Sequence, residues 1–123
     1  MVVEDNEDLS EMFCLFLEAD GYDVCACFDG KEAVAKVDQF QPHLILLDIM
    51  MPRMNGYEVL RELREKIKKN APILVIINSN IFGKDDIKKA LDLGATKFIK
   101  KSEYTPEETV QVIKDTLQEI NIV

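Results

Sequence analysis

Residues 44–48 of the chain read LILLD. The four apolar residues follow one another without the alternation that a strand with one solvent-facing side shows. Such continuous runs are typical of central strands in a parallel sheet, because helices cover both faces of that sheet. The run ends at Asp48, and open α/β sheets gather functional groups at the carboxyl ends of their strands. The stretch therefore predicts a buried parallel strand with an acid at its functional edge.

Short apolar runs and longer amphipathic stretches alternate on both sides of this strand. Gly21 and Gly94 follow two of the amphipathic stretches as natural helix ends. Residues 105–108 read TPEE, the hydroxyl, proline and glutamate of a capping box at a helix start. We expect strands over residues 1–3, 23–28, 44–47, 72–77 and 97–99, and helices over residues 9–20, 30–40, 57–69, 84–93 and 105–120. Five strands alternating with five helices predict a parallel sheet with helices on both faces.

Length and composition indicate one ordinary globular domain over residues 1–123. Hydrophobic residues make up 47% of the chain and charged residues 31%, and the sequence contains no linker or repeat. The net charge of −8 argues against a nucleic-acid surface and against adhesion to anionic membranes. Three cysteines without a regular framework, at positions 14, 25 and 27, favour a reducing, cytoplasmic setting and a role as small buried hydrophobic residues. No apolar run is long enough to span a membrane, and no signal peptide opens the chain.

Acidic residues stand at the ends of two predicted strands. Glu4 and Asp5 follow the first strand, and Asp48 ends the third. If these strands are neighbours in the sheet, three carboxylates meet at one edge, where their repulsion requires protonation or a cation. Mg²⁺ suits such a cluster because it prefers oxygen ligands and commonly pairs carboxylates with a phosphate. We therefore expect Mg²⁺ as the cofactor, held by Glu4, Asp5 and Asp48.

Two further strand ends supply a hydroxyl and ammonium groups at the same edge. Ser79 follows the fourth predicted strand, and Lys100 and Lys101 end the fifth. Carboxylate, metal, hydroxyl and lysine together favour phosphoryl transfer to a carboxylate nucleophile, with Asp48 attacking in line. Taken singly, each of these side chains also has a plain explanation as a helix cap, a turn residue or a solvated lysine. Their coincidence at four strand ends favours the site.

Three segments resemble the receiver domains of bacterial response regulators, and the resemblance covers almost the whole chain. Residues 2–9 (VVEDNEDL) resemble the family's acidic-pair segment. Residues 44–56 (LILLDIMMPRMNG) are the most specific match, with the phosphoacceptor position at Asp48. Residues 93–101 (LGATKFIKK) resemble the segment that leads to the family's lysine, which falls on Lys101. The resemblance implies a flavodoxin-like, doubly wound (βα)5 sandwich with a five-stranded parallel sheet of order 2-1-3-4-5.

The resemblance implies how Mg²⁺ is held. Asp5 and Asp48 would bind the ion directly, together with the backbone carbonyl of Met50. Glu4 would act mainly through water.

The resemblance also implies a switch. Ser79 would bond one phosphoryl oxygen and Lys101 another. Phe98 matches the aromatic switch position, which turns inward when Ser79 is drawn toward the phosphate. The face formed by helix 84–93, strand 97–99 and the last helix would then carry the signal to a downstream protein.

Several positions depart from the family's pattern. Ser102 stands where proline usually follows the lysine, so we expect a trans peptide bond there or a visibly strained loop. Asn78 is a minor rival of Ser79 for the hydroxyl position, because the segment before it is longer than usual. Met50 and Ile81 are apolar at the two positions that usually tune hydrolysis, so we expect slow autodephosphorylation. The first strand is also short at its start.

The leading hypothesis is a stand-alone phosphorylation switch that takes a phosphoryl group from a sensor histidine kinase. It would catalyse only its own phosphorylation and dephosphorylation, so we do not expect an enzyme, and it would be a monomer or a phosphorylation-dependent dimer. The second hypothesis is a receiver-like interaction module that works without phosphorylation. A flavin protein of the same strand order would need a small, glycine-rich phosphate loop, which the first loop lacks. An aspartyl-nucleophile hydrolase would need an acid in place of Met50. With no output domain, we expect no direct contact with nucleic acid.

Overall fold

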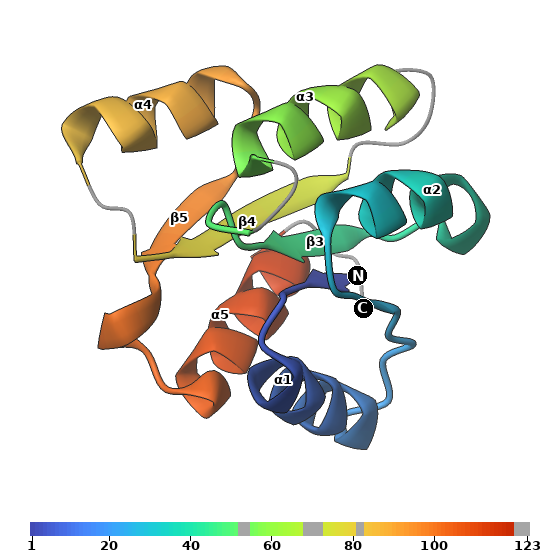
Figure 1. The fold of residues 1–123 in the computed structure, drawn as a ribbon. Coiled ribbons are helices and arrows are strands. Elements are labelled where there is room, and N and C mark those ends of the chain that lie inside the picture. The colour runs from blue at the N-terminus through green and yellow to red at the C-terminus, as the bar shows by residue number, and fades with distance from the viewer. Residues whose placement is uncertain (52–54, 68–72, 81–82, 120–123) are drawn as a thin grey trace.

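The computed structural model describes residues 1–51, 55–67, 73–80 and 83–119. Strands and helices alternate along the chain, as Figure 1 shows. In chain order the elements are β1 (Val2–Val3), α1 (Glu7–Ala19), β2 (Ala26–Cys27), α2 (Gly30–Phe40), β3 (Leu44–Leu47), α3 (Gly56–Ile67), β4 (Leu74–Ser79), α4 (Lys84–Asp92), β5 (Lys97–Lys100), the 3₁₀ helix η1 (Lys101–Glu103) and α5 (Pro106–Glu119).

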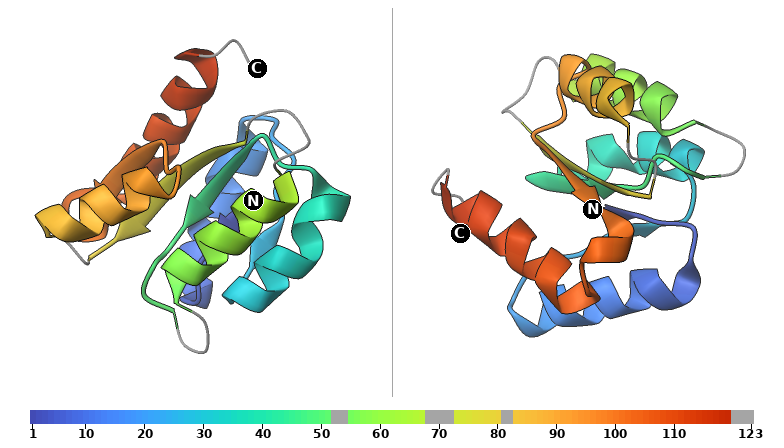
Figure 2. Two further views of the ribbon diagram at one scale, coloured as in Figure 1. Left: turned by 90° about the horizontal axis from the view of Figure 1, so that it is seen from above. Right: turned by 90° about the vertical axis from the view of Figure 1, so that its left-hand side faces the viewer.

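The strands form one sheet of order β2-β1-β3-β4-β5, and every pairing in it is parallel. Helices α1 and α5 cover one face, while α2, α3 and α4 cover the other (Figures 1 and 2). The strand order reverses between β1 and β3, and doubly wound sheets carry their functional groups at the carboxyl ends of the two strands that flank this reversal. The predicted fold class and strand order are confirmed.

The central strand β3 is buried on both faces. Ile45 and Leu47 belong to the core under α2 and α3, whereas Leu44 and Leu46 belong to the core under α1 and α5. Successive side chains of a strand point to opposite faces, so a sheet with two covered faces needs an apolar residue at every position. This explains why residues 44–47 show no alternation.

Four of the strands differ from their predicted extents, and β1 does so only by beginning at Val2 and not at Met1. β2 pairs only over Ala26–Cys27, not over residues 23–28, because its neighbour β1 offers only Val2 and Val3 as partners. β4 runs from Leu74 to Ser79, so Ser79 ends the strand and does not follow it. β5 extends one residue further than predicted, to Lys100. In each case the extent depends on which residues of the neighbouring strand are in register.

The starts of α1 and α5 follow from local capping chemistry. The Glu108 N–H donates to Thr105 Oγ1 at 3.1 Å, and the Thr105 N–H donates to Glu108 Oε1 at 2.9 Å. These two bonds confirm the predicted capping box of α5. α1 begins two residues earlier than predicted, because Asn6 Oδ1 accepts the Leu9 N–H at 3.0 Å.

Some predicted ends of helices and strands fall on residues that the structure does not describe. Residues 68, 69, 72 and 120 of the predicted elements lie outside the described residues. α4 ends at Asp92, with Leu93 as its C-cap. Gly94 follows at φ +99°, a conformation that favours glycine, as expected for a helix end.

The cysteines are not clustered into a binding site. Cys27 is fully buried, while Cys14 and Cys25 are half-buried and pack against the two cores. Burial and the neighbouring Cys25 raise the pKa of the Cys27 thiol to about 12, so it stays protonated at neutral pH. Within the described part of the chain, no helix combines the length and apolar composition that crossing a bilayer requires.

Candidate functional site

Three acidic side chains meet at the carboxyl edge of the sheet. β1 and β3 are paired, with Val3 opposite Leu47, so the residues that follow these strands leave the sheet side by side. An oxygen of each carboxylate of Glu4, Asp5 and Asp48 lies within 4.8 Å of the other two. The three carboxylates thus meet because β1 and β3 are neighbours in the sheet, as predicted.

The three acids differ in exposure. Glu4 is 2% exposed and Asp48 is 5% exposed, whereas Asp5 is exposed. Burial raises the pKa of the Glu4 carboxyl, and hydrogen bonds from Lys101 and from the Asn6 N–H only partly offset this effect. The cluster is therefore a buried pair of acids with a third at its open side.

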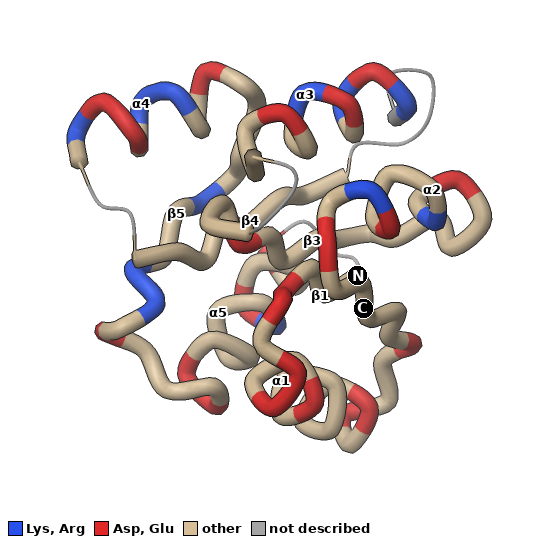
Figure 3. The backbone as a smooth tube through the Cα atoms, in the orientation of Figure 1, with Lys and Arg blue, Asp and Glu red and all other residues tan. Residues whose placement is uncertain are grey.

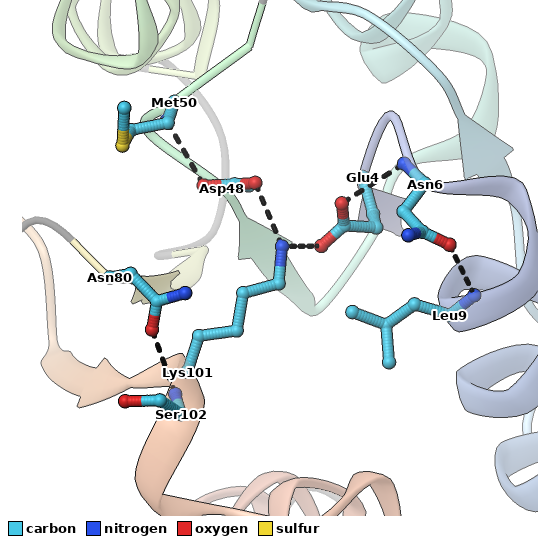
Figure 4. A network of polar contacts seen from close by, with 8 residues as sticks. All are labelled: Glu4, Asn6, Leu9, Asp48, Met50, Asn80, Lys101 and Ser102. Carbon is cyan, nitrogen blue, oxygen red and sulfur yellow. Dashed lines mark hydrogen bonds and ion pairs between the residues drawn. The ribbon is translucent and has the colours of Figure 1, made fainter.

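Lys101 lies between the two buried carboxylates, as Figure 4 shows. Its Nζ is 2.5 Å from Glu4 Oε1 and 3.0 Å from Asp48 Oδ2. Burial alone would lower the pKa of the ammonium, but the hydrogen bonds to Glu4 and Asp48 outweigh that effect and raise the pKa. One ammonium thus offsets part of the charge of two buried acids.

Backbone N–H groups hold the remaining carboxylate oxygens. The Asn6 N–H donates to Glu4 Oε2 at 3.1 Å, and the Met50 N–H donates to Asp48 Oδ1 at 3.0 Å. Each buried acid therefore has one oxygen fixed by the backbone and the other by Lys101 (Figure 4). Such hydrogen bonds favour a defined carboxylate orientation.

The donor set fits Mg²⁺. Three carboxylate oxygens at mutual distances within 4.8 Å are hard oxygen ligands, and the exposed Asp5 leaves the cluster open to solvent and to a phosphate. Figure 3 shows acidic residues at the end of β1 and the start of α1, with lysines at the end of β5 across the same edge. The site therefore combines an acidic side and a cationic side.

The hydroxyl and aromatic residues of the predicted switch lie on β4 and β5. Ser79 is fully buried at the end of β4, and its register partner is Lys100. Its rival Asn78 is also buried, and the alternation of the strand directs the two side chains to opposite faces. Phe98 is half-buried against the core under α2, α3 and α4.

The loop after Lys101 shows how the chain accommodates Ser102. No cis peptide bond occurs in the described residues, so the bond before Ser102 is trans, one of the two predicted outcomes. The Ser102 N–H donates to Asn80 Oδ1 at 2.8 Å, a bond that proline could not make (Figure 4). Of the two positions expected to slow hydrolysis, Met50 is 58% exposed and Ile81 lies outside the described residues.

Sequence reasoning missed two contributions to this site. Asn6 both caps α1 and holds Glu4 through its N–H, although an asparagine followed by Glu7 and Asp8 was a readable helix-start signal. The bridge from Lys101 to both acids left no signal, because it depends on the side-chain conformation of a residue 53 positions from Asp48.

A cavity of about 550 Å³ opens at the opposite edge of the sheet. Met1, Tyr22, His43, Leu44 and Leu117 are among the residues that line it. It contains none of the site residues, so the chemistry of the carboxyl edge does not involve it.

Comparison with known families gives a match over most of the chain. The family model described as the response regulator receiver domain matches residues 1–114. The alkaline phosphatase synthesis transcriptional regulatory protein PhoP of Bacillus subtilis is 34% identical over 99% of this chain and 49% of its own length. The DNA-binding response regulator MtrA of Mycobacterium tuberculosis is 33% identical over 96% of this chain and 50% of its own length. The chain thus spans about half the length of these curated relatives.

Solved structures share the fold. A CheY-like response regulator receiver domain protein from Methanospirillum hungatei matches with a TM-score of 0.85 and 25% identity, over 96% of this chain and 91% of that one. A chain of the CheX–CheY–BeF3–Mg²⁺ complex from Borrelia burgdorferi matches with a TM-score of 0.81 and 26% identity, over 94% of this chain and 86% of that one.

Proposed function

Because the chain belongs to the family of response regulator receiver domains, we propose that it is a signalling switch that accepts a phosphoryl group on Asp48. The observation that carries this proposal is the contact of Lys101 Nζ with Asp48 Oδ2 at 3.0 Å, beside Glu4 and Asp5. An aspartate at a strand end, with a lysine and two further acids around it, has the parts that carboxylate phosphorylation requires.

In the proposed reaction Asp48 is the nucleophile. A carboxylate oxygen of Asp48 forms a bond to phosphorus as the bond from phosphorus to the donor breaks, and the donor keeps the electron pair. The donor is the phosphohistidine of a sensor histidine kinase. The Met50 N–H, 3.0 Å from Oδ1, holds the carboxylate in place during this transfer.

Lys101 has a second task in this proposal. Its ammonium rests on Glu4 and Asp48 before the reaction, and it turns to an oxygen of the incoming phosphoryl group. Ser79 bonds another phosphoryl oxygen from the end of β4. Both groups act on charge that arrives with the phosphoryl group, so neither needs to transfer a proton.

Glu4, Asp5, Asp48 and the backbone carbonyl of Met50 would hold Mg²⁺. When bound, the ion supplies positive charge that offsets the charge of the phosphoryl oxygens. The Borrelia burgdorferi complex, which was solved with BeF3 and Mg²⁺, supports this cofactor by similarity.

The output of the switch is a change of protein surface. Ser79 on β4 and Phe98 on β5 connect the site with the face of α4, β5 and α5, which would bind a downstream protein. The chain acts on no external substrate in this account. DNA binding, which the name of MtrA states, is a property of a relative of which this chain matches half the length.

One observation favours a second candidate, an interaction module that does not use phosphorylation. Lys101 already offsets part of the charge of the buried acids, so their burial depends less on a metal ion. Such a module would keep a constant binding face.

Intact-mass analysis after incubation with acetyl phosphate and Mg²⁺ separates the two. We expect the protein to gain one phosphoryl group, and we expect no gain for Asp48→Asn or in the presence of a chelator. A half-life of many minutes for the product would agree with the apolar side chain of Met50 at the mouth of the site. A folded wild-type protein that gains no phosphoryl group would overturn the proposed switch and would favour the interaction module that does not use phosphorylation.

A further inference from the structure

The first turn of α3 rests directly on the backbone that follows Asp48. The Gly56 N–H donates to the Ile49 carbonyl oxygen at 3.0 Å. A Cβ at Gly56 would collide with Ile49 Cα and would lie 3.1 Å from the Asp48 carbonyl oxygen. This close approach requires glycine, and it means that a shift of the Asp48–Ile49 backbone is passed to the start of α3.

Tyr57, the second residue of α3, reaches from this turn to α4. Its hydroxyl donates to Asp86 Oδ1 at 3.1 Å, and the ammonium of Lys89 lies 4.3 Å from the centroid of its ring. The tyrosine is 7% exposed and belongs to the core. Burial and the hydrogen bond to Asp86 raise the pKa of Tyr57 to about 12, so the hydroxyl remains a donor at neutral pH.

Helix α4 has few other anchors among the described residues. Ala90 is its one buried residue, and its N-cap Gly83 makes no side-chain capping bond. At its far end, the Arg64 guanidinium donates to the Gly94 carbonyl oxygen. Elements with few buried apolar contacts open at low free-energy cost, so polar contacts from α3 contribute a large share of what holds α4.

We propose that Tyr57 is a positioning residue that couples the backbone after Asp48 to α4, because it directly follows Gly56, which rests on Ile49, and its hydroxyl donates to Asp86. This inference rests on the proposed function and adds a connection from the acceptor to α4 that passes through α3, apart from Ser79 and Phe98. Phosphorylation of Asp48 shifts the Ile49 backbone, the start of α3 follows, and the Tyr57–Asp86 bond changes with it.

Hydrogen exchange of residues 84–92, followed by mass spectrometry, tests the hold on α4. Without phosphorylation, we expect Tyr57→Phe to speed exchange in α4 about tenfold while α5 exchanges as before, because a bond from a hydroxyl to a carboxylate is lost. Asp86→Ala breaks the same bond from the other side and is expected to have the same effect. Asp85→Ala is the matched control, since Asp85 lies in the same helical turn and is exposed.

The same variants, treated with acetyl phosphate and Mg²⁺, test the coupling. We expect all of them to be phosphorylated. In Tyr57→Phe and Asp86→Ala, we expect phosphorylation to change the exchange of α4 by less than half as much as it does in the wild type. Equal α4 exchange in wild type and both variants, or an undiminished change upon phosphorylation, would overturn the inference. The intact mass of each sample distinguishes the two proposals. A wild-type protein that is not phosphorylated contradicts both the proposed function and the coupling. The exchange of the untreated samples still shows whether the Tyr57–Asp86 bond stabilises α4.

Discussion

Lys101 places one ammonium group between two carboxylates that have almost no contact with solvent. Glu4 and Asp48 are 2% and 5% exposed, and both bind the same Nζ. A buried charge without a partner is far more costly than a buried pair, so the lysine contributes to folding as well as to the proposed chemistry. The two roles predict different effects of the same substitution.

Replacing Lys101 by methionine should lower the free energy of unfolding by about 2–3 kcal/mol in metal-free buffer at neutral pH, because two buried acids lose their partner. Urea unfolding measures this loss. Lys101→Arg keeps the charge, so its free energy of unfolding should fall by less. Mg²⁺ should stabilise Lys101→Met more than the wild type, since the ion can take over the compensation. Equal stability of Lys101→Met and wild type without metal would contradict the bridge.

At the scale of single residues, the sequence was enough to predict the positions that are fixed by the ends of strands. Glu4, Asp5 and Asp48 could be placed together because parallel strands end at one edge, whichever conformers their side chains adopt. The contacts of Lys101 could not be predicted in this way. A long, flexible side chain has many conformers, and the one it takes depends on the acids that fold around it.

The short helix η1 contains Ser102, which stands where the family that the chain resembles usually has proline. Lys101, Ser102 and Glu103 form a 3₁₀ turn directly after β5. The Ser102 N–H donates to Asn80 Oδ1 at 2.8 Å, which ties this turn to the end of β4. The serine thus supplies a backbone donor that the loop uses.

Ser102→Pro should therefore not stabilise the protein, although it restores the residue usual at this position. Loss of the N–H should lower the free energy of unfolding by about 0.5–1.5 kcal/mol, as for a typical hydrogen bond. Ser102→Ala keeps the N–H and should be nearly neutral. Chemical denaturation of the three proteins provides the comparison, and a Ser102→Pro protein at least as stable as Ser102→Ala would contradict the role of this bond.

Among the elements, those with local signals were predicted best. The capping box at Thr105 and Glu108 lies in four consecutive residues, and α5 begins where it indicates. The length of β2 was predicted wrongly, because it is fixed by β1, more than twenty residues away in the chain. Strand extents require a partner, and a single segment does not contain that information.

At the scale of the whole molecule, the start of the chain lies in the middle of the sheet. Met1 is 7% exposed, and its α-amine donates to the Leu44 carbonyl oxygen at 2.9 Å. Burial lowers the pKa of this amine from 8.0 to about 6. The folded state therefore binds fewer protons than the unfolded state between these two pH values.

A polypeptide that begins at Met1 should become more stable as the pH rises from 6 to 8. The free energy of unfolding should increase by about 2 kcal/mol, because each unit of pKa difference corresponds to roughly 1.4 kcal/mol. Urea titrations at pH 6, 7 and 8 measure the slope. A variant with Gly-Ser before Met1 moves the amine out of this position. The stability of this variant should show most of the pH dependence lost. A flat profile for both proteins would contradict the buried amine.

The central claim is that Asp48 is the phosphoacceptor, and chemical trapping tests it most directly. Borohydride reduces an acyl phosphate to an alcohol, so a phosphorylated aspartate becomes homoserine, which tandem mass spectrometry locates in the sequence. After treatment with acetyl phosphate, Mg²⁺ and borohydride, we predict homoserine at position 48 and none in a chelated control. Homoserine at Asp5 or at another acid, or none anywhere in a folded protein, would contradict the account.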